Sequence, residues 1–222
     1  MTRRIRFPLA LALLVSASGC ISFDPASTRQ LDEADRLERA ASLNPSNAHA
    51  WFATGKQRLD AGDFDGAQEA FQSALAAQPE FDEAELGLAL SHLEQREFAA
   101  ARRAYTALAE RRPDLAAAWE GLAATELEAR RPDAAEAAAR EALRCDGRSA
   151  PALRVLGEAA YIRGDHRAAV RAWSAAIDAD PALEPRLGPL LADLRLYLRK
   201  YAPGADMGSD TAANAPATER PR

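Results

Sequence analysis

The stretch DAGDFDGAQEAFQSALAAQP, residues 60–79, decides the fold. Its apolar residues Phe64, Ala67, Phe71 and Ala74 recur every three or four positions, which is the spacing of one helix face. Pro79 then ends the segment. A helix this short, with a stripe made mostly of alanine, is not stable alone in water. The segment therefore needs neighbours of the same kind to bury its apolar face.

The same pattern returns every 34 residues through most of the chain. Prolines keep this step at Pro45, Pro79, Pro113 and Pro181, and Gly147, another helix breaker, stands at the remaining position. One column inside the repeat is always alanine, and another is mostly aromatic. These columns are Ala67, Ala101, Ala135 and Ala169, and Phe71, Tyr105, Ala139 and Trp173. A fixed period of this length indicates stacked repeats, each of which buries its apolar face on the next.

Two further columns carry a family resemblance. They are Trp51, Glu85, Trp119 and Leu153, and Gly55, Ala89, Ala123 and Gly157. Together with the alanine, aromatic and proline columns, they resemble the tetratricopeptide repeat. The resemblance implies an all-α, right-handed solenoid of four 34-residue helix-turn-helix repeats, over 48–81, 82–115, 116–149 and 150–183. A half-repeat helix over 29–43 and a capping helix over 186–201 would close its ends, so that the solenoid covers residues 29–201.

The turns and one departure from the family pattern give more specific expectations. Gly62 and Gly164 suit a turn residue with positive φ, while Arg96 and Arg130 at the same position would be strained. Asp63 and Asp165 are placed to cap the second helix of their repeats. The tyrosine usual in the first helix is absent, and we expect the next, apolar position to take over its packing. The replaced positions are Arg58, His92, Glu126 and Ala160, followed by Leu59, Leu93, Leu127 and Tyr161.

The predicted capping helix has one apolar face. That face comprises Leu187, Leu190, Leu191, Leu194, Leu198 and Tyr201. Arg195, Arg199 and Lys200 are expected to turn away from it. The simplest interpretation is a lid for the fourth repeat; the alternative is an amphipathic surface for a membrane or a second protein.

The first 19 residues have the features of a secretory signal peptide, with three arginines before a short apolar run. The following segment ASGC, residues 17–20, resembles the lipobox of bacterial lipoproteins. The resemblance implies that Cys20 becomes a lipidated N-terminus and that residues 20–28 form a tether. Ile21 after the cysteine favours outer-membrane sorting by the same resemblance. An ordinary secretory signal with a chance cysteine is the alternative. Residues 202–222, rich in Ala, Pro and Gly, are expected to be a disordered tail.

The composition argues against several functions. The formal net charge is −5, which makes nucleic acid an unfavourable partner. No metal-ligand spacing, phosphate loop or nucleophile motif is present, so we expect no enzyme activity, no cofactor and no metal. Cys145 is expected to be a buried, free thiol, with pairing between chains as the alternative. Glu126 and Glu128 are expected to lie on a solvated face.

In tetratricopeptide arrays the first helix of each repeat lines a groove for a peptide or a partner helix. Carried onto this chain, the groove positions are His49, Phe52, Lys56, Glu83, Leu86, Leu90, Glu120, Ala124, Arg154 and Glu158. The apolar patch Phe52, Leu86 and Leu90 would anchor the partner, unless these side chains only pack against neighbouring repeats. The resulting hypothesis is a membrane-tethered adaptor of the bacterial envelope. The alternatives are an assembly factor for pilus secretins or outer-membrane proteins, and a structural component that associates with itself.

Overall fold

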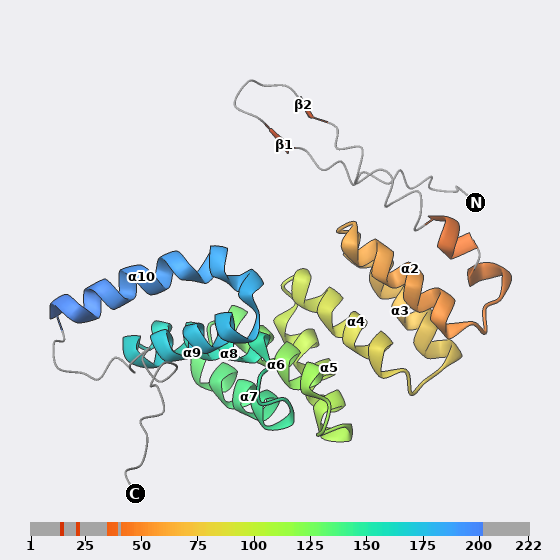
Figure 1. Ribbon diagram of the computed structural model, residues 1–222. Helices are drawn as coiled ribbons and strands as arrows, with labels where there is room; N and C mark the ends of the chain where they lie inside the picture. Colours follow the sequence, from red (N-terminus) through yellow and green to blue (C-terminus); the bar gives the residue numbers. More distant parts are fainter. Residues whose placement is uncertain (1–13, 16–20, 23–34, 40, 202–222) are drawn as a thin grey trace, which may run out of the picture.

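The computed structural model describes residues 14–15, 21–22, 35–39 and 41–201 of the chain. Eight helices of two lengths form four hairpins in a row, which confirms the predicted all-α solenoid of 34-residue repeats (Figure 1). The first helices of the repeats, the A helices, are α2 (Ala48–Asp60), α4 (Asp82–Glu94), α6 (Ala116–Glu128) and α8 (Ala150–Ile162). The second helices, the B helices, are α3 (Phe64–Ala77), α5 (Phe98–Arg111), α7 (Pro132–Cys145) and α9 (His166–Ala179).

Shorter elements flank the repeats. A 3₁₀ turn, η1 (Pro181–Leu183), leads into the capping helix α10 (Glu184–Tyr201), two residues earlier than predicted. Residues 35–39 and 41–43 are helical, within the predicted half repeat. Two short strands, β1 (Leu14–Val15) and β2 (Ile21–Ser22), pair antiparallel. Residues 1–13, Cys20, most of the tether and the tail 202–222 lie outside the described residues.

The turns between A and B helices follow the sequence expectation. Gly62 and Gly164 have φ of 77° and 80°, and Arg96 and Arg130 have φ of 61° and 60° at the same position. The Asp63 carboxylate accepts a hydrogen bond from the Gly66 N–H, and Asp165 caps α9 in the same way. A left-handed residue at this point reverses the chain within one turn, so each B helix lies against its own A helix.

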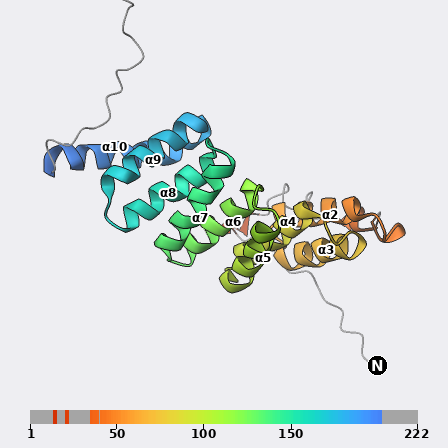
Figure 2. The same ribbon diagram turned by 90° about the horizontal axis from the view of Figure 1, so that it is seen from below.

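The A helices form the closer row of the solenoid. Each A helix packs against its own B helix, and α4, α6 and α8 also pack against the preceding B helix. In addition, α2, α4, α6 and α8 contact one another in sequence. Because the stack is tighter along this row, the A helices line its inner, concave side. Figure 2 shows the repeats following one another from α2 and α3 at one end to α9 and α10 at the other.

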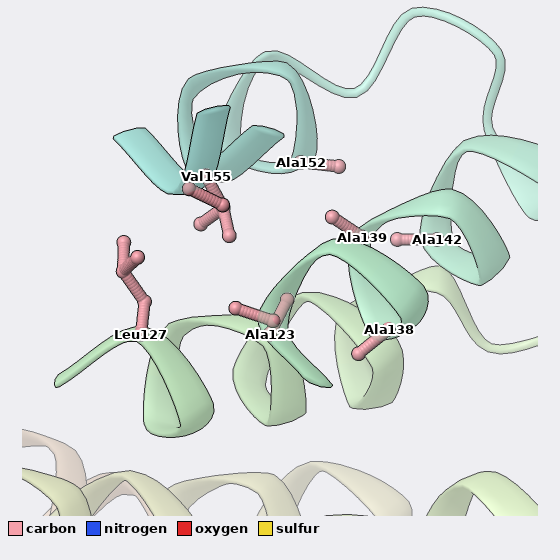
Figure 3. Close-up of a cluster of buried hydrophobic side chains, with 9 residues drawn as sticks. Ala123, Leu127, Ala138, Ala139, Ala142, Ala152 and Val155 are labelled. Carbon is pink, nitrogen blue, oxygen red and sulfur yellow. The ribbon is translucent and has the colours of Figure 1, made fainter. Parts of the chain in front are cut away.

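Aromatic rings of the B helices fill spaces left by glycines of the A helices. Phe71 is 1% exposed, and a Cβ added at Gly87 in the next repeat would lie 2.5 Å from its ring. A Cβ at Gly121 would lie 2.2 Å from the ring of Tyr105. Between the third and fourth repeats this relation is reversed, because Ala139 faces a cluster that includes Val155 (Figure 3). Adjacent repeats therefore keep a filled core with different residue pairs.

The capping helix α10 packs along α9 with only part of the predicted apolar face. Leu187, Leu191, Leu194 and Leu198 are buried. Leu190 is 50% exposed, so its predicted place in the buried stripe is wrong. Arg195 does not turn away either, because its guanidinium donates a hydrogen bond to Ser174 Oγ at 2.9 Å. The buried stripe, spaced by four, three and four residues, is narrower than the sequence predicted because, among the described helices, α10 packs mainly along α9.

Candidate functional site

One face of the A helices carries a row of side chains that are exposed or half-buried in every repeat. We call it the inner row; it contains the second, ninth and thirteenth residues of each A helix, which share one helix face. Its members are His49, Lys56 and Asp60; Glu83, Leu90 and Glu94; Ala117, Ala124 and Glu128; and Pro151, Glu158 and Ile162. Most of them are exposed and the remainder are half-buried, so a ligand could contact every repeat at once.

The predicted apolar anchors are used largely for packing. Phe52 is half-buried, with its ring centroid 5.8 Å from that of Phe71 and 5.2 Å from that of Phe81. Leu86 packs against two buried clusters, both of which include residues of α5. Leu90 belongs to the inner row and is half-buried. Of the three side chains, Leu90 is therefore the one best placed to meet a partner.

The predicted polar groove residues divide into exposed and bonded groups. His49, Lys56 and Glu83 are exposed, and the His49 ring stacks on Phe81 with centroids 4.9 Å apart. The Glu120 carboxylate of α6 accepts a hydrogen bond at 2.5 Å from Oγ of Ser149, the residue that caps the start of α8.

Near the C-terminal end of the groove, Arg154 and Glu158 form an ion pair at 2.6 Å, and Arg186 of the capping helix lies 3.9 Å from Glu158. These two predicted groove residues are thus already paired with each other. Ala124, the predicted groove residue of the third repeat, is half-buried.

The position that lacks the family tyrosine forms polar bridges between repeats. Glu126 is 5% exposed, with Oε1 2.6 Å from Arg102 Nε and Oε2 3.2 Å from Arg131 Nη1. Its predicted place on a solvated face is wrong, because Arg102 of the preceding B helix covers it. His92 Nδ1 lies 3.1 Å from Gln68 Nε2 and 2.6 Å from a Glu97 carboxylate oxygen.

Arg58 holds the same place in the first repeat and pairs with Asp63, at 2.6 Å, and with Glu38. Burial lowers the pKa of Arg58, but the hydrogen bond to Asp63 and the charge of Glu38 raise it, and the net change is upward. In the fourth repeat Ala160 is buried, and Arg163 replaces this bridge by pairing with Glu136. The polar position thus holds the solenoid together rather than binding a ligand.

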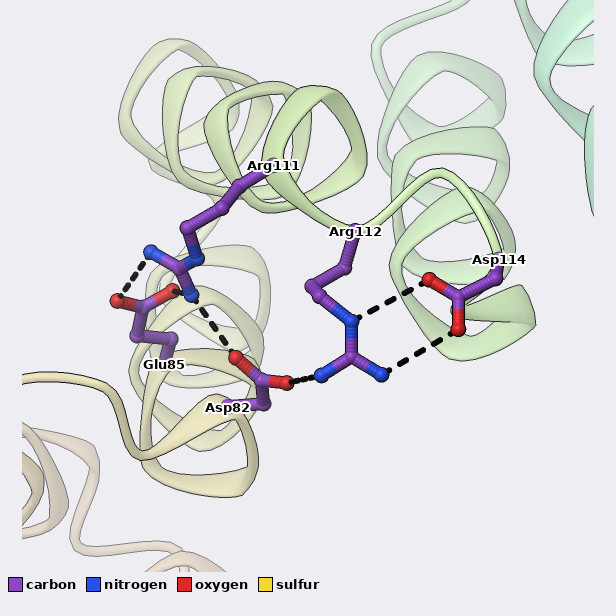
Figure 4. A network of polar contacts seen from close by, with 5 residues as sticks. All are labelled: Asp82, Glu85, Arg111, Arg112 and Asp114. Carbon is purple, nitrogen blue, oxygen red and sulfur yellow. Dashed lines mark hydrogen bonds and ion pairs between the residues drawn. The ribbon is translucent and has the colours of Figure 1, made fainter.

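A second network neutralises the outer edge of the second repeat (Figure 4). Arg111 at the end of α5 binds Glu85, at 2.5 Å and 3.0 Å, and Asp82, at 2.9 Å. Arg112 binds Asp82 and Asp114. Hydrogen bonds with Glu85 and Asp82 raise the pKa of Arg111, and the hydrogen bond from Arg112 lowers the pKa of Asp114. Acids at the start of α4 and bases at the end of α5 also suit the helix dipoles.

The inner-row acids stand apart from both networks. Asp60, Glu94 and Glu128 end their A helices at the same repeat position, and all three are exposed. Neither they nor Glu83 form a hydrogen bond or ion pair with any described residue. Sequence reasoning placed Glu83 in the groove and Glu128 on a solvated face, but it did not assign Asp60, Glu94 and Glu128 to the groove, although their 34-residue spacing is visible in the chain. The groove face of the first three repeats is therefore acidic and open to a cation.

A patch of large apolar side chains was also missed. At the C-terminal end of the inner row, Tyr161 and Ile162 are 51% and 46% exposed, so Tyr161 does not take over the packing predicted for it. Leu190 and Tyr197 of α10 are exposed to a similar degree. His166 links two of these residues, since its ring centroid lies 5.6 Å from that of Tyr161 and 5.4 Å from that of Tyr197. We call these four exposed residues at the C-terminal end of the solenoid, Tyr161, Ile162, Leu190 and Tyr197, the terminal patch.

Other site types were searched in the described part of the chain. There, no group of three or more His, Cys, Asp or Glu side chains converges to hold a metal ion. No helix in that part is long and apolar enough to cross a membrane. Cys145 is free and exposed, which corrects the predicted burial. It is the last residue of α7, and its thiol donates a hydrogen bond to the Pro113 carbonyl at 3.2 Å.

Sequence comparison identifies the repeats. One tetratricopeptide repeat profile matches residues 29–80 and 125–184, and another matches residues 58–125. The chain belongs to the tetratricopeptide repeat family. A search of curated proteins finds no match to this sequence. Family membership makes the chain a scaffold of the kind that mediates protein or peptide interactions.

Solved structures agree on the fold. A thermophilic tetratricopeptide repeat protein from Thermus thermophilus has a TM-score of 0.63 and 18% identity, over 77% of this chain and 93% of its own. MamA has a TM-score of 0.58 and 18% identity, over 73% and 98% of the two chains. YrrB, described as having an unusual peptide-binding site, has a TM-score of 0.55 and 17% identity, over 79% and 86%. At these identities the similarity establishes the fold alone.

Proposed function

We propose that this protein is a membrane-tethered adaptor of the bacterial cell envelope that binds a protein or peptide along its inner row. The observation that carries the binding role is the inner row itself: in all four repeats, residues that share one face of the A helix are exposed or half-buried. The peptide-binding site in the name of the similar structure YrrB supports this use of the fold.

The tether rests on the sequence. The basic and apolar start of the chain, followed by ASGC, supports a lipid on Cys20, with the repeats held near the outer membrane on its periplasmic side. Several acyl chains together hold a protein stably on a bilayer, since each buried CH₂ contributes about 0.8 kcal/mol. Mass spectrometry of the membrane-extracted protein tests this: the expected mature chain begins with acylated Cys20, and an unmodified peptide that continues upstream of Cys20 would disprove the tether.

The binding role is tested with a partner captured by crosslinking in membranes. Leu90→Ala should weaken binding by about 1–3 kcal/mol if Leu90 is a buried anchor at the interface. Glu158→Lys should have a smaller, salt-dependent effect, because rim charges mostly steer association. Gln72→Ala changes an exposed side chain of α3; this variant is the matched control and should bind normally. Phe52→Ala is less informative, because Phe52 also packs against Phe71 and Phe81. Full binding by a folded Leu90→Ala variant, with loss in α10 variants, would move the site to the capping helix.

A further inference from the structure

The inner row changes its chemistry along the solenoid. In the first three repeats the thirteenth residue of the A helix is an acid, namely Asp60, Glu94 or Glu128. In the fourth repeat the same position is Ile162, which lies in the exposed terminal patch. The inner-row acid of that repeat, Glu158, is already paired with Arg154. The groove is therefore acidic over three repeats and apolar at its C-terminal end.

The spacing of the three acids fits an extended chain. Contacting helices lie about 8–10 Å apart, so successive inner-row carboxylates are separated by about that distance. A peptide in the extended polyproline II conformation has three residues per turn and rises about 3.1 Å per residue, so every third side chain lies on one face and near the next carboxylate. Each carboxylate lacks a partner among the described residues, so a cation can bind it without displacing an existing ion pair.

The terminal patch gives the ligand a direction. Beneath Tyr161 lies Trp173, which is 3% exposed, with ring centroids 5.6 Å apart. An exposed aromatic ring backed by a buried one is suited to an apolar side chain of a ligand.

We propose that the inner row binds an extended basic segment of a partner protein, with Lys or Arg at about every third residue along Asp60, Glu94 and Glu128 and an apolar end on the terminal patch. This inference rests on the proposed use of the groove and specifies the chemistry of its ligand. The opposite charges of groove and ligand select a basic segment, and the apolar end of that segment sets its direction along the groove.

Fluorescence anisotropy with labelled peptides tests the inference on the folded chain. The probe is a peptide of about 12 residues with Lys at every third position and Leu-Phe at the end that would meet the fourth repeat. One control peptide has the same lysines clustered at one end, and another has Glu in place of Lys. We expect the spaced peptide to bind tightest and the Glu peptide not to bind. Equal binding of spaced and clustered lysines would overturn the proposed register.

Two charge-matched triple variants separate the groove from general attraction. Asp60→Lys, Glu94→Lys and Glu128→Lys together should weaken the spaced peptide by about ten-fold or more and reduce its salt dependence. The control changes Glu69, Glu110 and Asp178, exposed acids of the B helices, to Lys and should bind nearly as the unmodified protein does. Circular dichroism confirms that both variants fold. Equal losses in the two triple variants would mean that net charge alone attracts the peptide, and the inference would be wrong.

A third comparison tests whether the apolar end of the peptide binds the terminal patch. Ile162→Ser should remove the advantage of the Leu-Phe peptide over one ending in Ser-Ser, while leaving the lysine contribution unchanged. If Ile162→Ser has no effect on that advantage, the terminal patch is not the anchor. If an envelope partner crosslinks to Leu90 while no basic peptide binds, the ligand chemistry proposed here is wrong and the proposed binding function remains.

Discussion

The junctions between repeats solve one packing problem in two ways. Between the first and second repeats, and again between the second and third, an aromatic ring on a B helix meets a glycine on the next A helix. Between the third and fourth repeats, the same two positions hold Ala139 and Val155. The larger side chain has moved from the B helix to the A helix, while the helix lengths and the repeat period stay the same.

The difference shows that the geometry of this solenoid depends on the volume shared by two positions, rather than on either position alone. A core is filled to high density, so a ring opposite glycine and a valine opposite alanine are both acceptable pairs. A ring opposite valine or an alanine opposite glycine would not be, because the first overfills the junction and the second leaves a cavity. The following predictions test this pairing in order of expected effect.

Phe71→Ala should cause the largest loss of stability. The ring contacts Gly55 and Gly87 on two A helices, so its removal leaves a cavity that neither glycine can fill. We expect a loss of about 3–5 kcal/mol in the free energy of unfolding, measured by urea denaturation. Ala139→Gly at the equivalent position of the third repeat is the comparison and should cost about 1 kcal/mol, mainly through helix propensity. Similar losses for the two variants would contradict the volume argument.

Converting the alanine–valine junction into the ring–glycine type gives a sharper test. Ala139→Phe alone should destabilise the protein by about 1–3 kcal/mol through overpacking against Val155. Adding Val155→Gly should recover part of this loss, although glycine in a helix itself costs about 1 kcal/mol. A double-mutant cycle measures the coupling between the two positions. Strictly additive effects would show that the two positions do not share volume.

The ring–glycine junction of Tyr105 contains a phenol that can ionise, so it should weaken at high pH. The alanine–valine junction contains no ionisable side chain. Burial raises the pKa of Tyr105 above its ordinary value, and the charge of Glu94 raises it further. The neutral phenol is therefore favoured in the folded state; its contribution is complete below pH of about 10 and is lost as pH rises above that value. The denaturation midpoint should fall above this pH, and Tyr105→Phe should show a smaller fall than the unmodified protein. An identical pH profile for Tyr105→Phe would exclude this origin.

The smallest expected change in stability concerns the turns between A and B helices. Arg130 has φ of 60°, which costs a non-glycine residue about 1–2 kcal/mol, so Arg130→Gly should stabilise the third repeat slightly, by less than about 1 kcal/mol. Arg96 has a similar φ, but its guanidinium lies 5.2 Å from the Phe98 ring centroid. Arg96→Gly would lose this cation–π contact of about 0.5–1 kcal/mol and should gain less or nothing. Thermal melts of the two variants compare them, and a lower midpoint for Arg130→Gly would refute strain at this turn.

The helices were predictable because local residues define their ends. Gly62, Gly164, the capping aspartates and the repeated prolines fix where each helix begins or stops, and the 34-residue period repeats that information four times. The site was less predictable because exposure depends on the adjacent repeat. Glu126 is buried by Arg102 from the preceding B helix, and Phe52 is occupied by Phe71 and Phe81.

The end of the solenoid shows the same limit. Tyr161 and Leu190 have the apolar character of packed positions, but no further repeat follows to cover them in the described chain. Periodicity assigns each residue to a helix face, whereas its burial depends on whether a neighbour occupies that side. The acids Asp60, Glu94 and Glu128 became notable only when the ion pairs of the surrounding acids were known.

Site-specific photocrosslinking in intact cells is the most direct test that a partner lies along the inner row. A photoreactive amino acid replaces Ala124 in the inner row, Gln72 on α3, or Glu110 on α5, one at a time. The account predicts a discrete crosslinked partner from position 124 and none from positions 72 and 110. The same partner crosslinked from position 72 or 110, with none from position 124, would contradict it.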